Sequence, residues 1–354
     1  MTVKSDIRAE ANRLRAAFEA RGAETFEPQI LQPAGALLNL YGEEIRARAF
    51  VTQDPLRGEM MLRPDFTVPL VQAHIDHARA ETRYTYAGEI FRRQEDDDTR
   101  PTEYMQVGFE IIGHAPSADA EIAADAEVFA TIADTLNGLP VTGTIGDFNV
   151  LTTAILGLDT PRRRKDALLR HLWRPTRFKA LLDRFSRPAP PVPAPADLNI
   201  PHVGLRSPVE IETRLALLAE EAETPLLKSV EVDRLMALMA IRSTAPAAVD
   251  DIKRIAGGDE DIVDAARGVE ALLDALAAKN IDPATLKFEA SYGLTALEYY
   301  TGFVFGFSAP NLPTVATGGR YDLLTATLSG GRCIPAVGGV IRPDAALALR
   351  GTAK

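Results

Sequence analysis

The chain has 354 residues, of which 46% are hydrophobic and 25% are charged, a balance typical of globular proteins. Its formal net charge of −10 argues against a nucleic-acid-binding surface spread over the whole protein. Cys333 is the only cysteine, which excludes intrachain disulfides and a cysteine-based metal cluster. No apolar run reaches the roughly 20 residues that span a bilayer, so we expect a cytoplasmic protein of one large domain with an insertion, or of two domains.

The N-terminal part of the chain predicts alternating helices and short strands. Residues 5–22 have the apolar periodicity of a charged amphipathic helix, which is unlike a signal peptide. A short strand over 24–31 and a polar helix over 34–41 follow. A further strand then enters the segment LRPDFT, and a helix leaves it near residue 68.

The junction at LRPDFT offers candidate capping and polar side chains. Asp65 and Thr67 stand where a helix cap is expected. His74 and His77 follow at i, i+3 spacing, but no Glu or Cys stands beside them to complete a ligand set. The sequence therefore predicts no metal site here.

Residues 83–113 predict two strands joined by a strongly acidic loop. In the second strand, period-two alternation places Gln106 and Glu110 on one side, on either side of Gly108, and apolar residues on the other. Arg92 ends the first strand. The polar side of this hairpin is either the wall of a ligand site or a plain solvated strand face.

The middle of the chain is mainly helical. A helix is predicted over 117–136, a strand over 141–148 and a basic helical run over 161–185. Four consecutive cations, Arg162 to Lys165, open that run. They suit either a phosphate or an acidic partner, or they form a solvated helix face, which is the commoner explanation.

The last part of the chain returns to strands. A proline-rich linker over 187–195 and a helical stretch over 207–278 come first. Strand-like segments follow, with a short helix over 321–328 and a strand over 336–341 that leads into a terminal helix. Because long helical runs separate groups of hairpin-like strands, the fold class expected is α+β, with an antiparallel sheet flanked by helices.

Several separated segments resemble the catalytic core of histidyl-tRNA synthetase, a class II aminoacyl-tRNA synthetase. FEARGAETFEPQILQP is similar to motif 1, MLRPDFT to a Leu-Arg-Pro-Glu-x-Thr segment, and GEIFRR with QVGFE to motif 2. LEYYTGFVF is similar to the histidine-specific Tyr-Tyr segment, and GGRYDLL with PAVGG to the approach to motif 3. The resemblance implies a class II core made of residues 1–157 and 256–354, with a helical insertion at 158–255.

The departures from this family concern the activation chemistry. Ala345 stands where motif 3 has an ATP-binding arginine, Thr295 where the Tyr-Tyr segment has an arginine, and Gln94 where motif 2 has a glutamate. The motif 2 loop reads EDDDTRPT, which would repel a nucleotide and an RNA backbone. Loss of one guanidinium donor costs about 3–4 kcal/mol of transition-state stabilisation, so aminoacylation is not expected. Nine residues follow Ala345, so no anticodon-binding domain is expected.

The residues on the amino-acid side of the site match the family's motifs, except that Asp65 stands where the family has a glutamate, which shortens the reach of this side chain by one methylene. By motif position, the resemblance implies that Arg92 meets a ligand carboxylate and that Glu110 accepts a hydrogen bond from an imidazole N–H. Inheritance without binding is the alternative. The other implied contacts are Asp65, Thr67 and Gln106 with the ligand amino group, and Tyr299 or Tyr300 with the imidazole.

A synthetase core without its chemistry is similar to the regulatory subunits of ATP phosphoribosyltransferase. Members of that family associate with a short catalytic chain in the first step of histidine biosynthesis. The resemblance implies no catalytic residue and no cofactor in this chain, a hetero-oligomer with that catalytic chain, and a self-dimer through the motif 1 region. It also implies feedback by histidine, and it implies no nucleic-acid partner.

Two alternatives stand beside this interpretation. One is a ligase that activates an amino acid without tRNA, which Ala345 and Thr295 oppose. The other is a free histidine-sensing protein or a binder of tRNA fragments. Association with a phosphoribosyltransferase chain distinguishes the second alternative from the regulatory subunit.

Overall fold

The computed structural model describes residues 3–35, 48–94, 101–188, 207–293, 300–310, 312 and 314–352. Its central element is a nine-stranded mixed sheet in the order β1-β5-β6-β12-β11-β10-β7-β9-β8, in which β1–β5 and β7–β9 are parallel pairs and the other pairs are antiparallel. A separate three-stranded sheet has the order β2-β4-β3. The strands are β1 (Glu24–Thr25), β2 (Leu31–Pro33), β3 (Val51–Asp54), β4 (Gly58–Leu62), β5 (Thr82–Phe91), β6 (Glu103–Ile112), β7 (Thr142–Asp147), β8 (Arg242–Thr244), β9 (Lys287–Glu289), β10 (Phe303–Ser308), β11 (Ala316–Arg320) and β12 (Ala336–Ile341).

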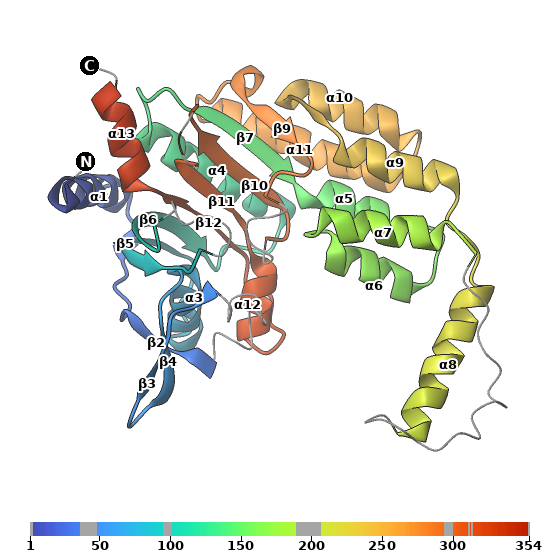
Figure 1. Ribbon diagram of the computed structural model, residues 1–354. Coiled ribbons are helices and arrows are strands. Elements are labelled where there is room, and N and C mark those ends of the chain that lie inside the picture. Colours follow the sequence, from blue (N-terminus) through green and yellow to red (C-terminus); the bar gives the residue numbers. More distant parts are fainter. Residues whose placement is uncertain are drawn as a thin grey trace.

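Some helices cover the sheet, and others lie beyond one of its edges (Figure 1). The predicted α+β class with a largely antiparallel sheet is confirmed, although two parallel pairs lie within the sheet. The helices are α1 (Lys4–Glu19), α3 (Thr67–Asp76), α4 (Ala118–Thr135), α5 (Phe148–Leu156), α6 (Arg162–His171), α7 (Pro175–Phe185), α8 (Pro208–Glu223), α9 (Ser229–Met239), α10 (Ala245–Ala256), α11 (Glu260–Ala278), α12 (Asp322–Leu328) and α13 (Pro343–Thr352).

One face of the sheet packs against α1 and α4. The ring of Phe109 on β6 lies 5.4 Å from that of Phe18 on α1, and Phe129 on α4 lies 5.0 Å from Phe307 on β10. Ser117 begins α4 by accepting a hydrogen bond from the backbone N–H of Ala120, as its N-cap position predicts. This face is the main hydrophobic core.

The opposite face of β6 is also buried. Alternation along β6 directs Gln106 and Glu110 away from α1, as predicted, but both side chains are enclosed, with residue exposures of 6% and 2%. The interpretation of this side as a solvated strand face is therefore wrong. The segment that leads into α3 covers it, and Arg63 fixes that segment by donating to the carbonyl oxygens of Pro28 and Glu89 at 2.7 and 2.8 Å.

Helices α5 to α10 lie beyond one edge of the sheet, and α8 projects from them (Figure 1). The span 158–255, which the resemblance assigns to an insertion, contains β8, and β8 pairs with β9 in the large sheet. Most of the predicted helix over 34–41, the proline-rich linker beyond residue 188 and the acidic residues 95–98 lie outside the described residues.

Candidate functional site: a polar pocket on β6

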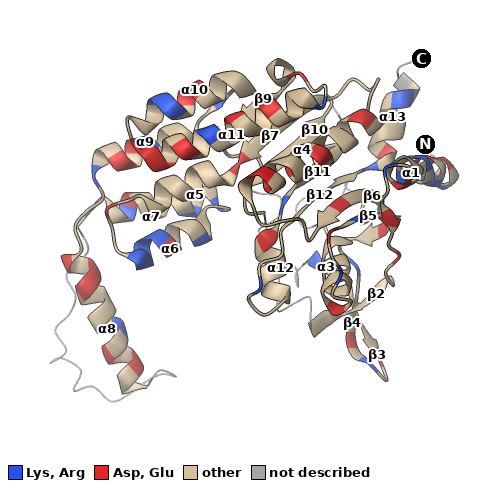
Figure 2. Cartoon of the chain, turned by 180° about the vertical axis from the view of Figure 1, so that it is seen from behind, with Lys and Arg blue, Asp and Glu red and all other residues tan. Residues whose placement is uncertain are grey.

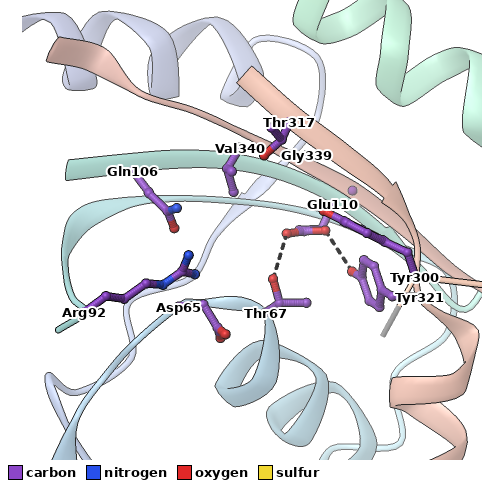
Figure 3. A pocket seen from close by; sticks show the side chains of 11 residues that line it. Asp65, Thr67, Arg92, Gln106, Glu110, Tyr300, Thr317, Tyr321, Gly339 and Val340 are labelled. Atoms are coloured by element: carbon purple, nitrogen blue, oxygen red, sulfur yellow. Dashed lines mark hydrogen bonds between the residues drawn. The ribbon is translucent and has the colours of Figure 1, made fainter. Parts of the chain in front are cut away.

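A polar pocket opens on the face of the sheet that α1 and α4 leave uncovered. Its walls come from the strands β6, β11 and β12 and from the start of α3, so distant parts of the chain meet there (Figure 3). Six of the seven predicted site residues line it, whereas Tyr299 lies outside the described residues. The lining residues are Asp65, Thr67, Arg92, Gln106, Glu110, Tyr300, Thr317, Tyr321, Gly338, Gly339 and Val340.

Glu110 is the most enclosed carboxylate of the pocket. Its Oε1 accepts a hydrogen bond from the hydroxyl of Tyr86 at 2.8 Å, and its Oε2 accepts one from the hydroxyl of Tyr321 at 2.8 Å. Thr67 donates to Oε1 at 3.5 Å. These three hydroxyl donors fix the carboxylate in one orientation.

Burial dominates the acidity of Glu110. It raises the pKa of this carboxyl to about 7, although the hydrogen bonds from Tyr86 and Tyr321 oppose the rise, and the nearby Asp65 adds to it. Burial also raises the pKa of the Tyr300 hydroxyl, and the negative charge of Glu110 adds to that effect. Burial therefore places the pKa of the Glu110 carboxyl near neutral pH.

The stability of the protein should depend on this carboxyl between pH 4.5 and 7. Within this window the unfolded chain has released the proton that folded Glu110 keeps, so the free energy of unfolding falls as the pH rises. The shift corresponds to about 3 kcal/mol, lost by pH 8. Denaturant unfolding of the wild type and of Glu110→Gln across pH 4–8 measures it. A stability difference between the two proteins that does not change with pH would contradict this assignment.

The other end of the pocket carries charge and amide groups. Figure 3 shows the side chains of Arg92, Asp65 and Gln106 together there, apart from Glu110, Tyr300 and Tyr321. Arg92 is held by its Nε, which donates to the carbonyl oxygen of Pro64 at 2.7 Å. A cation, a carboxylate and an amide at one end suit an α-amino acid backbone, and an acceptor with aromatic neighbours at the other end suits a polar ring.

The pocket is narrow. Its cavity volume is about 50 Å³, against roughly 150 Å³ for an engineered protein cavity that holds benzene. A ligand as large as an aromatic amino acid therefore requires lining side chains to move. Tyr321 is the side chain whose displacement would also free an oxygen of Glu110.

The glycines of the segment PAVGG have a steric role at this pocket. A Cβ built on Gly338 would overlap the carboxylate of Glu110, and one on Gly339 would press on Ile132 of α4. Because Tyr86 and Tyr321 hold Glu110 in place, the carboxylate has little freedom to yield. The glycine pair therefore lets β12 pass beside Glu110 on one face and α4 on the other.

Gly338→Ala should displace Glu110 and destabilise the protein by about 1–3 kcal/mol through overpacking. Gly268→Ala is a matched control, since nothing lies within 4 Å of the added Cβ in the middle of α11, and it should stabilise by about 0.5–1 kcal/mol. Thermal unfolding compares the two variants. Equal melting temperatures would show that the carboxylate yields freely.

Sequence reasoning missed two tyrosines of the site. Tyr321 belongs to the GGRYDLL segment, where the pattern drew attention to a turn and a helix and not to the hydroxyl. Tyr86 lies on β5 opposite Gly108, and a Cβ on Gly108 would overlap its ring. The glycine between Gln106 and Glu110 was a usable signal, because it indicated that something approaches the strand closely there.

The position that corresponds to the arginine of motif 3 belongs to the core. Ala345 lies on α13 and is 3% exposed. Arg342 precedes that helix, and its guanidinium pairs with Asp344 at 3.0 Å and lies over the ring of Tyr104. A buried methyl group at residue 345 offers nothing to a phosphate.

Within the described ranges, no group of three or more His, Cys, Asp or Glu side chains is arranged to hold a metal ion. His74 is 2% exposed and lies 3.0 Å from the hydroxyl of Tyr84 through its Nδ1, which gives it a structural role. None of the described helices is long and apolar enough to cross a membrane.

A protein-family model described as "Histidyl-tRNA synthetase" matches residues 4–185 and 211–346, which is most of the chain. The chain belongs to this family. The match includes every strand of the large sheet and every described residue of the pocket.

Two curated relatives are similar to this chain over nearly their whole length. The chain is 29% identical over 368 aligned positions to a protein of Brucella canis named "ATP phosphoribosyltransferase regulatory subunit", with 96% of each chain covered. A protein of Brucella abortus with the same name matches with the same identity and coverage.

Solved structures of this family share the fold. A structure from Bacillus halodurans, titled as an ATP phosphoribosyltransferase regulatory subunit/histidyl-tRNA synthetase, has a TM-score of 0.68 at 21% identity and covers 98% of this chain and 79% of the other. Histidyl-tRNA synthetase from Nostoc sp. PCC 7120 has a TM-score of 0.64 at 15% identity and covers 98% and 72%. The predicted class II synthetase-like fold is confirmed.

Proposed function

We propose that this chain is a non-catalytic regulatory subunit of ATP phosphoribosyltransferase, acting in the first step of histidine biosynthesis. The observation that carries the proposal is the similarity over 96% of both chains to proteins of that name. Such a subunit works through a partner, here a short catalytic phosphoribosyltransferase chain, and it needs no cofactor of its own.

The degenerate activation site supports a role without chemistry. Adenylate formation needs fixed cations around the transferring phosphates. At residue 345 the family's arginine is replaced by a buried alanine methyl group, and Arg342 is engaged by Asp344 and Tyr104. The chain alone should therefore release no pyrophosphate from ATP and histidine.

Histidine is the ligand that we propose for the pocket. Arg92 would meet its carboxylate, Asp65 and Gln106 its amino group, and Glu110 an imidazole N–H, with Tyr300 beside the ring. Since Thr67 donates to Glu110, it would orient that acceptor. Selectivity follows because an analogue without a ring N–H leaves a buried carboxylate without the donor that histidine supplies.

Feedback by histidine would follow from the narrowness of the pocket. A ligand changes a conformational equilibrium only if it binds one state better than another, and typical couplings are about 1–3 kcal/mol. Because the cavity is about 50 Å³ and Tyr321 occupies Oε2 of Glu110, a bound histidine would favour a state in which Tyr321 has moved. That state is the one we propose the catalytic chain detects.

A self-dimer through the motif 1 region is the second assembly that we propose. Apolar side chains around β2 are exposed there, with Ile30 at 44% and Leu31 at 38%. Leu31 lines a shallow groove together with Phe26, Pro28 and Met60. A second copy of the same surface would cover these side chains.

Size-exclusion chromatography with light scattering tests both assemblies. The chain alone should elute as a homodimer, and addition of the short catalytic chain from the same organism should give a larger hetero-oligomer. A chain that stays free of the catalytic chain while it binds histidine would favour the free sensor and overturn the proposed function. A monomer that still binds the catalytic chain would overturn only the self-dimer.

A further inference from the structure

A basic surface on α6 and α7 stands out from the rest of this acidic protein. Residues 161–187 contain ten lysines and arginines and only two aspartates, within a chain whose net charge is −10. Figure 2 shows lysine and arginine positions gathered on α6, whereas α8 beside it carries mainly acidic ones. We call these two helices with residues 186 and 187 the α6–α7 surface.

The start of α6 retains cations at an energetic cost. Arg162, Arg163, Arg164 and Lys165 occupy its first turn, where the helix dipole favours negative charge, and none of its N-terminal N–H groups receives a side-chain cap. Cations there typically cost about 0.3–1 kcal/mol each. Arg164 is explained by structure, because it is 4% exposed and donates to Glu221 on α8 at 2.8 Å. Its neighbours also have partners, since Arg162 pairs with Asp166, Arg163 donates to Glu221 and Lys165 donates to the carbonyl oxygen of Leu156, but all three are less buried than Arg164.

Two hollows lie among the cations of this surface. One is lined by α6 alone, through Arg163, Arg170 and His171 together with Asp166. The other is lined by Arg164, Arg184 and Arg187 beside Glu221. Glu221, which lines the second hollow, accepts hydrogen bonds from Arg164 and from Arg163, which lines the first hollow. The α6–α7 surface is therefore continuous rather than a set of isolated charges.

Much of this charge is not balanced within the described part of the chain. Ion pairs of the described residues engage Arg162, Arg163 and Arg164, but none engages five other cations of the surface. Arg177, Arg174 and Arg170 surround His171 closely enough to add to the lowering of its pKa that burial begins. Repulsion among these groups would be relieved by an anionic partner. The unengaged cations are Arg170, Arg177, Lys179, Arg184 and Arg187.

We propose that the α6–α7 surface docks an acidic surface of the phosphoribosyltransferase chain. The inference rests on the proposed function and names the face that this function requires. Guanidinium groups spread along two helices fit dispersed carboxylates, which they bind in a bidentate manner. The surface lies beyond α5, among the helices at the edge of the sheet (Figure 1).

A protein partner is favoured over a nucleic acid by two features. The aromatic side chains of the two helices and their connection are not exposed: Trp173 packs edge-on against Phe148 at 4.7 Å, and Phe178 and Phe185 are buried. Among the described residues of this surface, the two phenylalanine rings are thus withheld from base stacking, and Trp173 is half-buried with its ring packed against Phe148. The adjoining helix α8 carries five glutamates, which would repel a long phosphate backbone but leave a compact acidic patch undisturbed.

Charge reversal on the intact chain tests the docking surface. Arg170→Glu/Arg177→Glu and Arg184→Glu/Arg187→Glu each change the charge by four units in one part of the surface. Lys279→Glu/Lys287→Glu makes the same change at exposed positions outside it. Isothermal calorimetry with the short catalytic chain at two salt concentrations, after thermal melting has shown that each variant is folded, gives the affinities.

Each surface variant should bind the catalytic chain at least tenfold more weakly than the wild type. The affinity of the control variant should lie within threefold of the wild-type affinity. Wild-type affinity should fall as salt rises, and less so in the variants. Surface variants that bind like the control would overturn the docking surface and leave the proposed function intact. A wild type that fails to bind the catalytic chain would overturn both. If the wild type and the control variant bind an RNA duplex tightly and the surface variants do not, the surface binds nucleic acid instead.

Discussion

Glu110→Gln should lower the affinity of the chain for histidine at least 100-fold. The amide is close in size to the carboxylate, and Tyr86 and Tyr321 can still hydrogen-bond to it, so the pocket should keep its shape. What changes is the acceptor, because a neutral amide presents one oxygen where the carboxylate presented two and carries no charge to meet an imidazole N–H. Sites built to hydrogen-bond one ligand group commonly discriminate by more than this factor.

Calorimetry with histidine measures this loss, and Glu103→Gln is the matched control. Glu103 lies on the same strand but is exposed, and it pairs with Lys4 at the surface, so its replacement should leave the affinity within twofold. Binding to Glu110→Gln that matches the wild type would place histidine elsewhere on the chain. The variant should also gain stability above pH 7, because the cost of burying an ionisable carboxyl is removed.

Arg320→Ala should destabilise the protein by about 3–5 kcal/mol. Arg320 is 5% exposed, and its Nη2 donates to Asp125 on α4 at 2.7 Å and to the carbonyl oxygen of Glu121 at 3.0 Å. Its Nη1 faces Asp322 at 3.3 Å. Removal of the guanidinium leaves the carboxylate of Asp125 buried without its cation. Such an unpaired buried charge strongly destabilises the folded state.

The double variant Arg320→Met/Asp125→Leu is the control for this prediction. Replacing both partners removes the unpaired charge, so most of the lost stability should return. Urea unfolding compares the three proteins. If the single variant is as stable as the double one, the pair does not hold β11 to α4 as inferred. Arg320 and Asp322 also flank Tyr321, so a weakened histidine affinity should accompany the loss in Arg320→Ala.

The sequence predicted the hairpin of the site well because the information is local. Period-two alternation correctly separated Gln106 and Glu110 from the core side of β6, whereas the place beside Gly108, where a ligand was expected to approach the backbone, holds the ring of Tyr86. The burial of that polar side was not predictable from the strand alone. It depends on the segment before α3, which Arg63 ties to residues 28 and 89, far away in the sequence.

The partners of buried charges were the least predictable part of the fold. Glu110 is held by Tyr321, 211 positions away, and Arg164 by Glu221, 57 positions away. From the local pattern, Arg164 was one of four cations on a solvated helix face. This interpretation is wrong for Arg164, because the C-terminal end of α8 supplies Glu221 as its partner. The family resemblance supplied the order of the site segments, but not the two tyrosines that fix Glu110.

The most direct measurement is a phosphoribosyltransferase assay of the short catalytic chain with and without this protein. ATP, phosphoribosyl pyrophosphate and the catalytic chain are kept constant, and product formation is followed as this chain is added, with and without histidine. The account predicts that activity rises and saturates as the complex forms, that histidine lowers it, and that Glu110→Gln keeps the activation but loses the response to histidine. Activity that is the same with and without this chain would contradict the central claim.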